Sequence, residues 1–186
     1  MAVTQPRIIV VSAPSGAGKT TLIKEAQKIV PNIAFSISHT TRNPRAGEQN
    51  GRDYFFVSVS EFQNKIQEED FVEWAEVHGN YYGTSKSQIE ELVEQGNIVI
   101  LDIDVQGAMQ IKEKSDIDAT FLFIEPPSLE ELKSRLINRG TESEATLKKR
   151  LANAEIELGF KAQYDHVIVN DILNKAVRDF LAIVDN

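Results

Sequence analysis

Residues 8–21 read IIVVSAPSGAGKTT and join two patterns that together predict the fold. The apolar run from Ile8 to Val11 is typical of a parallel strand that is buried on both faces of a sheet. A glycine-rich turn follows, and we expect a helix from about Lys19 to Val30, ended by Pro31. A strand, a glycine-rich loop and a helix in this order form the structural context of a phosphate-binding P-loop.

The loop fits the P-loop motif with one departure. Gly16 and Gly18 allow backbone N–H groups to surround a phosphate, and the start of the helix adds the positive end of its dipole. Lys19 is expected to bridge the β- and γ-phosphates of a nucleoside triphosphate, and the Thr20 hydroxyl to ligate Mg²⁺. The strict motif has glycine where Ala13 stands, so we expect an ordinary backbone conformation there. The alternative interpretation is a glycine-rich turn that carries a surface lysine.

The rest of the chain alternates buried strands with helical patterns. Strands are expected at residues 98–103, 120–124 and 166–169, and helices at residues 85–96, after the capping-box sequence of residues 128–131, and at residues 172–184. This alternation predicts an α/β fold with a parallel, doubly wound sheet. Residues 36–82 break the rhythm with aromatic clusters and several glycines, and predict a small, partly antiparallel lobe inserted between core strands.

Composition excludes several classes of function. The 186-residue chain has no cysteine, which excludes disulfides, thiol catalysis and thiolate metal sites. Its apolar runs are too short to cross a bilayer and it begins without a signal peptide, so we expect a cytoplasmic protein that binds no membrane. The net charge of −8 argues against nucleic-acid binding. Residues 7–52 nevertheless carry seven basic and two acidic side chains, which indicates small anionic ligands.

A second motif, which is acidic, can also be derived from the residues themselves. Residues 98–104 read IVILDID and resemble a Walker B element, a buried strand that ends in carboxylates. Ligands of an open α/β sheet gather at the carboxyl ends of its strands, so Asp102 should face the P-loop. We expect Asp102 to join Thr20 in binding Mg²⁺. The alternative is a carboxylate that merely ends the strand.

Three further segments indicate a particular protein family more specifically than the P-loop does. They are residues 38–54, SHTTRNPRAGEQNGRDY; residues 79–84, GNYYGT; and residues 101–107, LDIDVQG. Together with the P-loop, they resemble the guanylate kinase family. The resemblance extends through residues 139–142, RGTE, and residues 167–171, VIVND, and so covers nearly the whole chain. It implies transfer of the γ-phosphoryl group of MgATP to GMP or dGMP, giving ADP and GDP or dGDP, in purine nucleotide metabolism.

The resemblance also implies how the chain is organised. A P-loop NTPase core would comprise residues of about 1–35, 86–130 and 160–186. A mixed α/β lobe of about residues 36–85 would bind the nucleoside monophosphate, and residues of about 131–159 would form a helical lid. All three parts would belong to one domain, residues 1–186.

Individual roles follow from the same resemblance. The ATP site would comprise Ala13, Pro14, Ser15, Gly16, Ala17, Gly18, Lys19, Thr20, Thr21 and, near the adenine, Asn170. The GMP site would comprise Ser38, Arg42, Arg45, Glu48, Tyr54, Glu73, Tyr82, Thr84 and Asp104, with Glu48 orienting the arginines. The catalytic cations would be Lys19, Arg42, Arg135, Arg139 and Arg150. Guanidinium groups suit this task because their planar N–H groups match the geometry of phosphate oxygens. Arg135 and Arg139 are four residues apart, and such a pair more commonly lies on a solvated helix face, which is the alternative interpretation.

Two alternatives share these motifs. A guanylate-kinase-like binding module, as in membrane-associated scaffolds, keeps the nucleotide fold without catalysis, but such modules usually lack a working P-loop. A kinase for another nucleoside monophosphate would differ at the base-reading positions Ser38, Glu73, Thr84 and Asp104. The sequence leaves open whether the protein is a monomer or a homo-oligomer.

Overall fold

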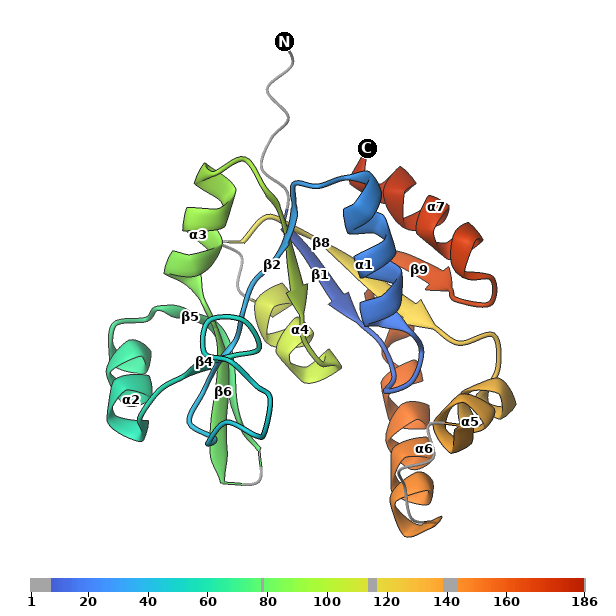
Figure 1. The fold of residues 1–186 in the computed structure, drawn as a ribbon, viewed down its shortest axis with the longest axis horizontal. Coiled ribbons are helices and arrows are strands. Elements are labelled where there is room, and N and C mark those ends of the chain that lie inside the picture. The colour runs from blue at the N-terminus through green and yellow to red at the C-terminus, as the bar shows by residue number, and fades with distance from the viewer. Residues whose placement is uncertain (1–7, 78, 114–116, 139–143, 186) are drawn as a thin grey trace.

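The computed structural model describes residues 8–77, 79–113, 117–138 and 144–185 (Figure 1). The elements are, in chain order, β1 (Ile8–Ser12), α1 (Lys19–Ile29), β2 (Ile33–Phe35), β3 (His39–Thr40), β4 (Phe55–Phe56), α2 (Val59–Gln67), β5 (Phe71–Val77), β6 (Asn80–Ser85), α3 (Lys86–Glu94), β7 (Ile98–Asp102), α4 (Val105–Glu113), β8 (Ala119–Glu125), α5 (Leu129–Asn138), α6 (Glu144–Leu158), a 3₁₀ turn (Lys161–Gln163), β9 (His166–Val169) and α7 (Leu173–Val184).

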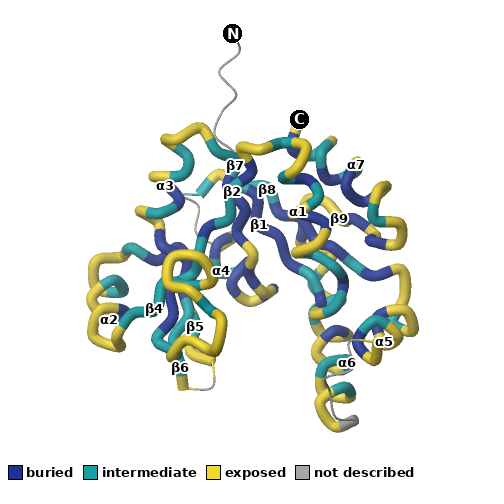
Figure 2. Tube along the Cα trace, viewed as in Figure 1, coloured by how far each residue is buried: buried dark blue, intermediate teal, exposed yellow. Residues whose placement is uncertain are grey.

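The core is a five-stranded parallel sheet in the order β2-β7-β1-β8-β9. Its central strand β1 is buried on both faces, as its apolar sequence predicts, and Figure 2 shows it buried along most of its length. Ile9 and Val11 pack with α1 and α7, whereas Val10 packs with α3 and α4 on the opposite face. The predicted parallel, doubly wound sheet is therefore confirmed.

A second sheet, in the order β4-β3-β6-β5, forms a separate lobe. Its strands β3 and β4 are parallel, and the other two pairings are antiparallel. Helix α2 covers this sheet through Phe62, whose ring stacks on Phe71 at 4.4 Å and on Tyr81 at 5.4 Å between centroids. Strand β4 is only two residues long because Ser58 begins a capping box with Glu61 and so starts α2. The predicted mixed lobe is confirmed.

Helices α5 and α6 pack together beside the P-loop through Leu132, Leu136 and Ala154. The Ser128 hydroxyl accepts a hydrogen bond from the Glu131 N–H at 3.1 Å, as the capping-box sequence predicts. The Glu131 carboxylate instead accepts a bond from Arg135 Nε at 3.0 Å. In Figure 1 the α5–α6 pair and the lobe lie on either side of the end of the core to which the strand arrows point. No helix in the described ranges is both long and apolar enough to span a bilayer.

His39 is a buried titratable residue of the lobe. Its side chain is 7% exposed, and its ring stacks on Phe55 at 4.9 Å between centroids. Burial lowers the pKa of His39 to about 4; Lys65 acts in the same direction and Asp70 opposes it. Nδ1 has no hydrogen-bond partner, so no hydrogen bond at this atom stabilises the protonated ring. His39 is therefore neutral at pH 7.

We expect the free energy of unfolding to fall as the pH is lowered from 6.5 to about 4. The unfolded state takes up the His39 proton through this window and the folded state does not, so protonation favours unfolding. Urea denaturation at pH 7.5 and pH 5.0 should show a loss of about 2 kcal/mol from this residue. In His39→Phe that part of the loss should disappear. An equal loss in the variant would contradict the buried neutral histidine.

Candidate active site

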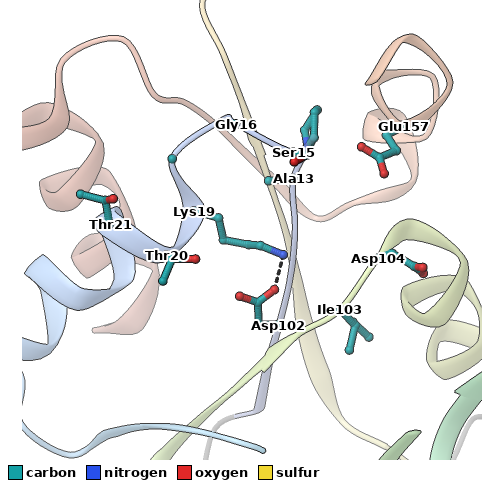
Figure 3. Close-up of a pocket in the computed structure, with 12 residues that line it drawn as sticks. Ala13, Ser15, Gly16, Lys19, Thr20, Thr21, Asp102, Ile103, Asp104 and Glu157 are labelled. Atoms are coloured by element: carbon teal, nitrogen blue, oxygen red, sulfur yellow. Dashed lines mark ion pairs between the residues drawn. The ribbon is translucent and has the colours of Figure 1, made fainter. Parts of the chain in front are cut away.

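A cavity of about 370 Å³ opens where the P-loop meets the carboxyl end of β7 (Figure 3). It is lined by Ala13, Pro14, Ser15, Gly16, Gly18, Lys19, Thr20, Thr21, Asp102, Ile103, Asp104 and Glu157. Most of the residues predicted to bind ATP are thus brought together here. We refer to it as the phosphate cavity.

The loop has the backbone conformation that its glycines permit. Gly16 and Gly18 have φ angles of 97° and 90°, which side chains rarely adopt. Gly18 is also the N-cap of α1, so the loop leads directly into the helix N-terminus. Ala13 is not among the described residues with positive φ, so its predicted ordinary backbone conformation is confirmed.

Asn170 supports the loop from beneath. Asn170 is only 6% exposed, and its Nδ2 donates to the carbonyl oxygen of Ala17 at 2.8 Å. Arg135 Nη1 of α5 donates to the Asn170 carbonyl oxygen at 3.1 Å, so α5 contacts the residue that supports the loop. Neither Ala17 nor Asn170 lines the phosphate cavity, and their contact with ATP stays a prediction.

Lys19 and Asp102 form an ion pair at the floor of the phosphate cavity (Figure 3). The Lys19 ammonium group also donates to the carbonyl oxygen of Val11 at 3.5 Å, and Thr20 lines the same cavity. A hydroxyl and a carboxylate are hard oxygen donors of the kind that Mg²⁺ prefers. Among the described residues no three acidic or histidine side chains are grouped to hold a metal ion alone. The donor set therefore fits a Mg²⁺ ion that is shared with bound phosphates.

A second cavity, of about 270 Å³, lies between the lobe and the carboxyl end of β7. Its lining comprises Ser38, Tyr54, Glu73, Ala75, Val77, Tyr82, Gly83, Asp102, Ile103 and Asp104. We refer to it as the lobe cavity. Asp102, Ile103 and Asp104 line both cavities, so the end of β7 is their common wall.

Glu73 is held at one corner of the lobe cavity. It is 7% exposed, and Oε1 accepts a hydrogen bond from Thr84 Oγ1 at 2.5 Å. Gly107 leaves the space for this carboxylate, because a Cβ there would lie 3.0 Å from Oε2. The Gly107 N–H in turn donates to Asp104 Oδ1 at 2.8 Å. The structure thus brings together Glu73, Thr84 and Asp104, three of the residues predicted to read a base.

Arg42 is fixed beside the lobe cavity by Glu48. Its Nη1 and Nη2 donate to the two carboxylate oxygens at 3.0 and 2.9 Å. Hydrogen bonding to Glu48 raises the pKa of Arg42, and Tyr82 adds to the rise. Glu48 also accepts a bond from the Arg45 N–H at 2.7 Å, so it orders the loop that carries both arginines. Neither Arg42 nor Arg45 lines the cavity.

The arginines of α5 and α6 approach the P-loop from the other side. Arg150 Nη1 donates to Ser15 Oγ at 3.1 Å, and this contact joins α6 to the loop. Arg135 binds Glu131 and the Asn170 carbonyl oxygen. Arg139 lies outside the residues that the structure describes.

Glu157 lines the phosphate cavity although it belongs to none of the sequence motifs. It comes from α6, and burial raises the pKa of its carboxyl; Asp104 adds to the rise and Lys19 opposes it. Its spacing of seven residues from Arg150 places both side chains on the same helix face. That spacing is the signal by which it could have been found.

Comparison with known proteins places this site in a family. The guanylate kinase family model matches residues 5–186. A guanylate kinase of Clostridium tetani is 48% identical over 177 residues, which are 95% of this chain and 84% of the relative. The crystal structure of a guanylate kinase from Anaplasma phagocytophilum is 34% identical with a TM-score of 0.73, covering 97% of this chain and 85% of that chain.

The fold extends to a more distant kinase. A shikimate kinase from Bacteroides thetaiotaomicron aligns with a TM-score of 0.51 over 97% of this chain and 99% of its own. At 14% identity this likeness concerns the fold alone. The family model, the relatives and the P-loop geometry agree: this chain belongs to the guanylate kinase family.

Proposed function

We propose that this chain transfers the γ-phosphoryl group of MgATP to GMP or dGMP and releases ADP and GDP or dGDP. The observation that carries the proposal is the common wall of the two cavities, Asp102, Ile103 and Asp104. A triphosphate in the phosphate cavity and a monophosphate in the lobe cavity would meet at this wall. Direct transfer between two bound nucleotides then needs no nucleophilic side chain.

The chain supplies the cations that such a transfer requires. Lys19 lies in the phosphate cavity, and Arg150 reaches the same loop from α6. Arg42 lies on the acceptor side, held by Glu48. Cations that are already oriented stabilise the charge of the transferring group without reorganising. Thr20 and Asp102 would hold Mg²⁺ together with the phosphates, and the ion would supply further charge neutralisation.

The lobe cavity suits guanine through Glu73. Guanine presents two adjacent donors, N1–H and the N2 amino group, and an ionised carboxylate accepts both. Adenine has an unprotonated N1 and no N2 amino group, so it would leave the carboxylate unpaired. Thr84 and Gly107 fix Glu73 for this contact, and the Ser38 side chain lines the same cavity. A site built on buried polar partners can reject the wrong ligand by roughly 10⁴-fold or more.

The direct test of the proposed function is an ADP-release assay with MgATP and, in turn, GMP, dGMP, AMP, CMP and UMP. We expect GMP and dGMP to be turned over far faster than the other three. Turnover that prefers AMP or a pyrimidine nucleotide would contradict the assignment of the acceptor. No turnover with any acceptor would instead favour a nucleotide-binding module without catalysis.

Glu73→Gln should lower kcat/KM for GMP at least 100-fold, because the amide offers one acceptor oxygen and turns a donor toward guanine. The preference for GMP over AMP should narrow, while ATP affinity stays within about twofold. Glu76→Gln is the matched control, since Glu76 is exposed on the same strand. Steady-state kinetics with both acceptors give the result. A Glu73→Gln enzyme that matches this control would refute base selection by Glu73.

Lys19→Ala should lower kcat about 1,000-fold or more, since it removes a cation that interacts more strongly with the transition state than with bound ATP. GMP affinity should change little, because Lys19 does not line the lobe cavity. The control is Lys28→Ala on the exposed side of the same helix. A Lys19→Ala enzyme with kcat close to that of the control would show that the loop is not the catalytic one.

The lobe and the α5–α6 region should close over bound nucleotides. Arg42 lies on the lobe and Arg150 on α6, on either side of the end of the core (Figure 1), so contact of both with one transferring group needs these two sides to approach each other. Small-angle scattering with GMP and a non-hydrolysable ATP analogue should give a smaller radius of gyration than the ligand-free protein. An unchanged radius would indicate a rigid, preformed site.

A further inference from the structure

Glu157 enters the phosphate cavity from the anchored end of α6. The next residue, Leu158, and Phe160 pack against the core cluster that contains Phe121, Phe123 and Tyr164. The carboxylate, which is half-buried, faces the cavity in Figure 3. Arg150 lies two turns away, about 10 Å along the helix axis at 1.5 Å per residue. Glu157 therefore stays beside the P-loop even if the far end of α6 moves.

The charged side chains that line the phosphate cavity are mostly acidic, and Arg150 adds a cation that binds Ser15 at its edge. Lys19 faces Glu157 from the start of α1, Asp104 from the end of β7, and the buried hydroxyl of Tyr164 from the core side. The charged side chains that line the cavity are three carboxylates, those of Asp102, Asp104 and Glu157, and one ammonium group, that of Lys19. Asp102 is already paired with this ammonium. Glu157 and Asp104 add negative charge that Lys19 alone does not balance.

An excess of negative charge is unexpected in a site for a polyanion. Two charges a few ångströms apart interact several-fold more strongly at a half-buried site than in bulk water, so each carboxylate raises the free energy of a bound triphosphate. A triphosphate that carries Mg²⁺ has two fewer net negative charges and is repelled much less. The same carboxylate therefore acts unequally on the two forms of the nucleotide.

We propose that Glu157 is a specificity-determining residue that makes the phosphate cavity accept the magnesium complex of ATP and reject free ATP. The proposal rests on the proposed function, because it takes ATP as the ligand of this cavity. Free ATP would otherwise occupy the P-loop without the cation that the transfer requires. Excluding it keeps the site available to the productive complex.

The test is equilibrium binding, measured by calorimetry, of ATP to the full chain with excess Mg²⁺ and with EDTA. In Glu157→Gln, the affinity for free ATP should rise about threefold to tenfold, whereas the affinity for MgATP, which keeps half of the net charge, should rise by at most about threefold. Glu157→Ala should shift the ratio of the two dissociation constants in the same direction. Glu155→Gln, an exposed carboxylate on the same helix, is the matched control and should leave the ratio unchanged.

Each outcome decides the proposal. A Glu157→Gln ratio equal to that of wild type and of Glu155→Gln would overturn it, as would an equal rise in affinity for both forms. If wild-type protein binds MgATP and the variants keep the same selectivity for MgATP over free ATP, the role of Glu157 is wrong. The proposed function then stays intact. Wild-type protein that binds neither form would overturn both.

Discussion

The parallel pairing of β7 with β1 is the constraint on which the rest of the site depends. It fixes Ile100 opposite Ile9 and Asp102 opposite Val11, so the end of β7 lies beside the start of the P-loop. From there Asp102 holds Lys19, and Asp104 accepts the N–H of Gly107 at the start of α4. Three consecutive residues thereby shape the wall between the two cavities. The buried sheet provides the rigidity that these side chains need.

The P-loop is also held from the side opposite to β7. Gly16 lies against Leu132 and Leu136 of α5, so that a Cβ at this glycine would approach both side chains to about 3 Å. Asn170, which follows β9, binds the loop, and so does Arg150 of α6. Helices α5 and α6, which carry Arg135 and Arg150, therefore contact the loop directly. Movement of α5 or α6 would therefore shift the phosphate-binding loop through direct contacts, with no intervening residues.

Local patterns in the sequence predict the parts of the structure that are local in origin. The buried run of β1, the glycines of the loop, the Ser85 cap of α3 and the acidic end of β7 all depend on neighbours in sequence. Family resemblance, rather than periodicity, brings in Glu73 and Thr84, which lie on adjacent strands. Even so, it does not show that Gly107 provides the space for Glu73, since that contact joins residues far apart in the chain.

Features that arise from tertiary packing could not be predicted in this way. Glu157 lines the phosphate cavity because Leu158 and Phe160 anchor α6, and Asn170 supports the loop because β9 lies at the sheet edge. The low pKa of His39 likewise results from burial in the lobe. Each depends on which surfaces meet after folding, which a single sequence does not reveal.

We infer that two nucleotides occupy the adjacent cavities and meet at the end of β7. An analogue in which adenosine and guanosine are joined by a polyphosphate chain tests it most directly. Calorimetry should show one analogue bound per chain, at least 100-fold more tightly than ATP or GMP alone, because the second contact becomes intramolecular. The bound analogue should also exclude both ATP and GMP. Binding no tighter than that of ATP, with GMP still able to bind, would contradict the account.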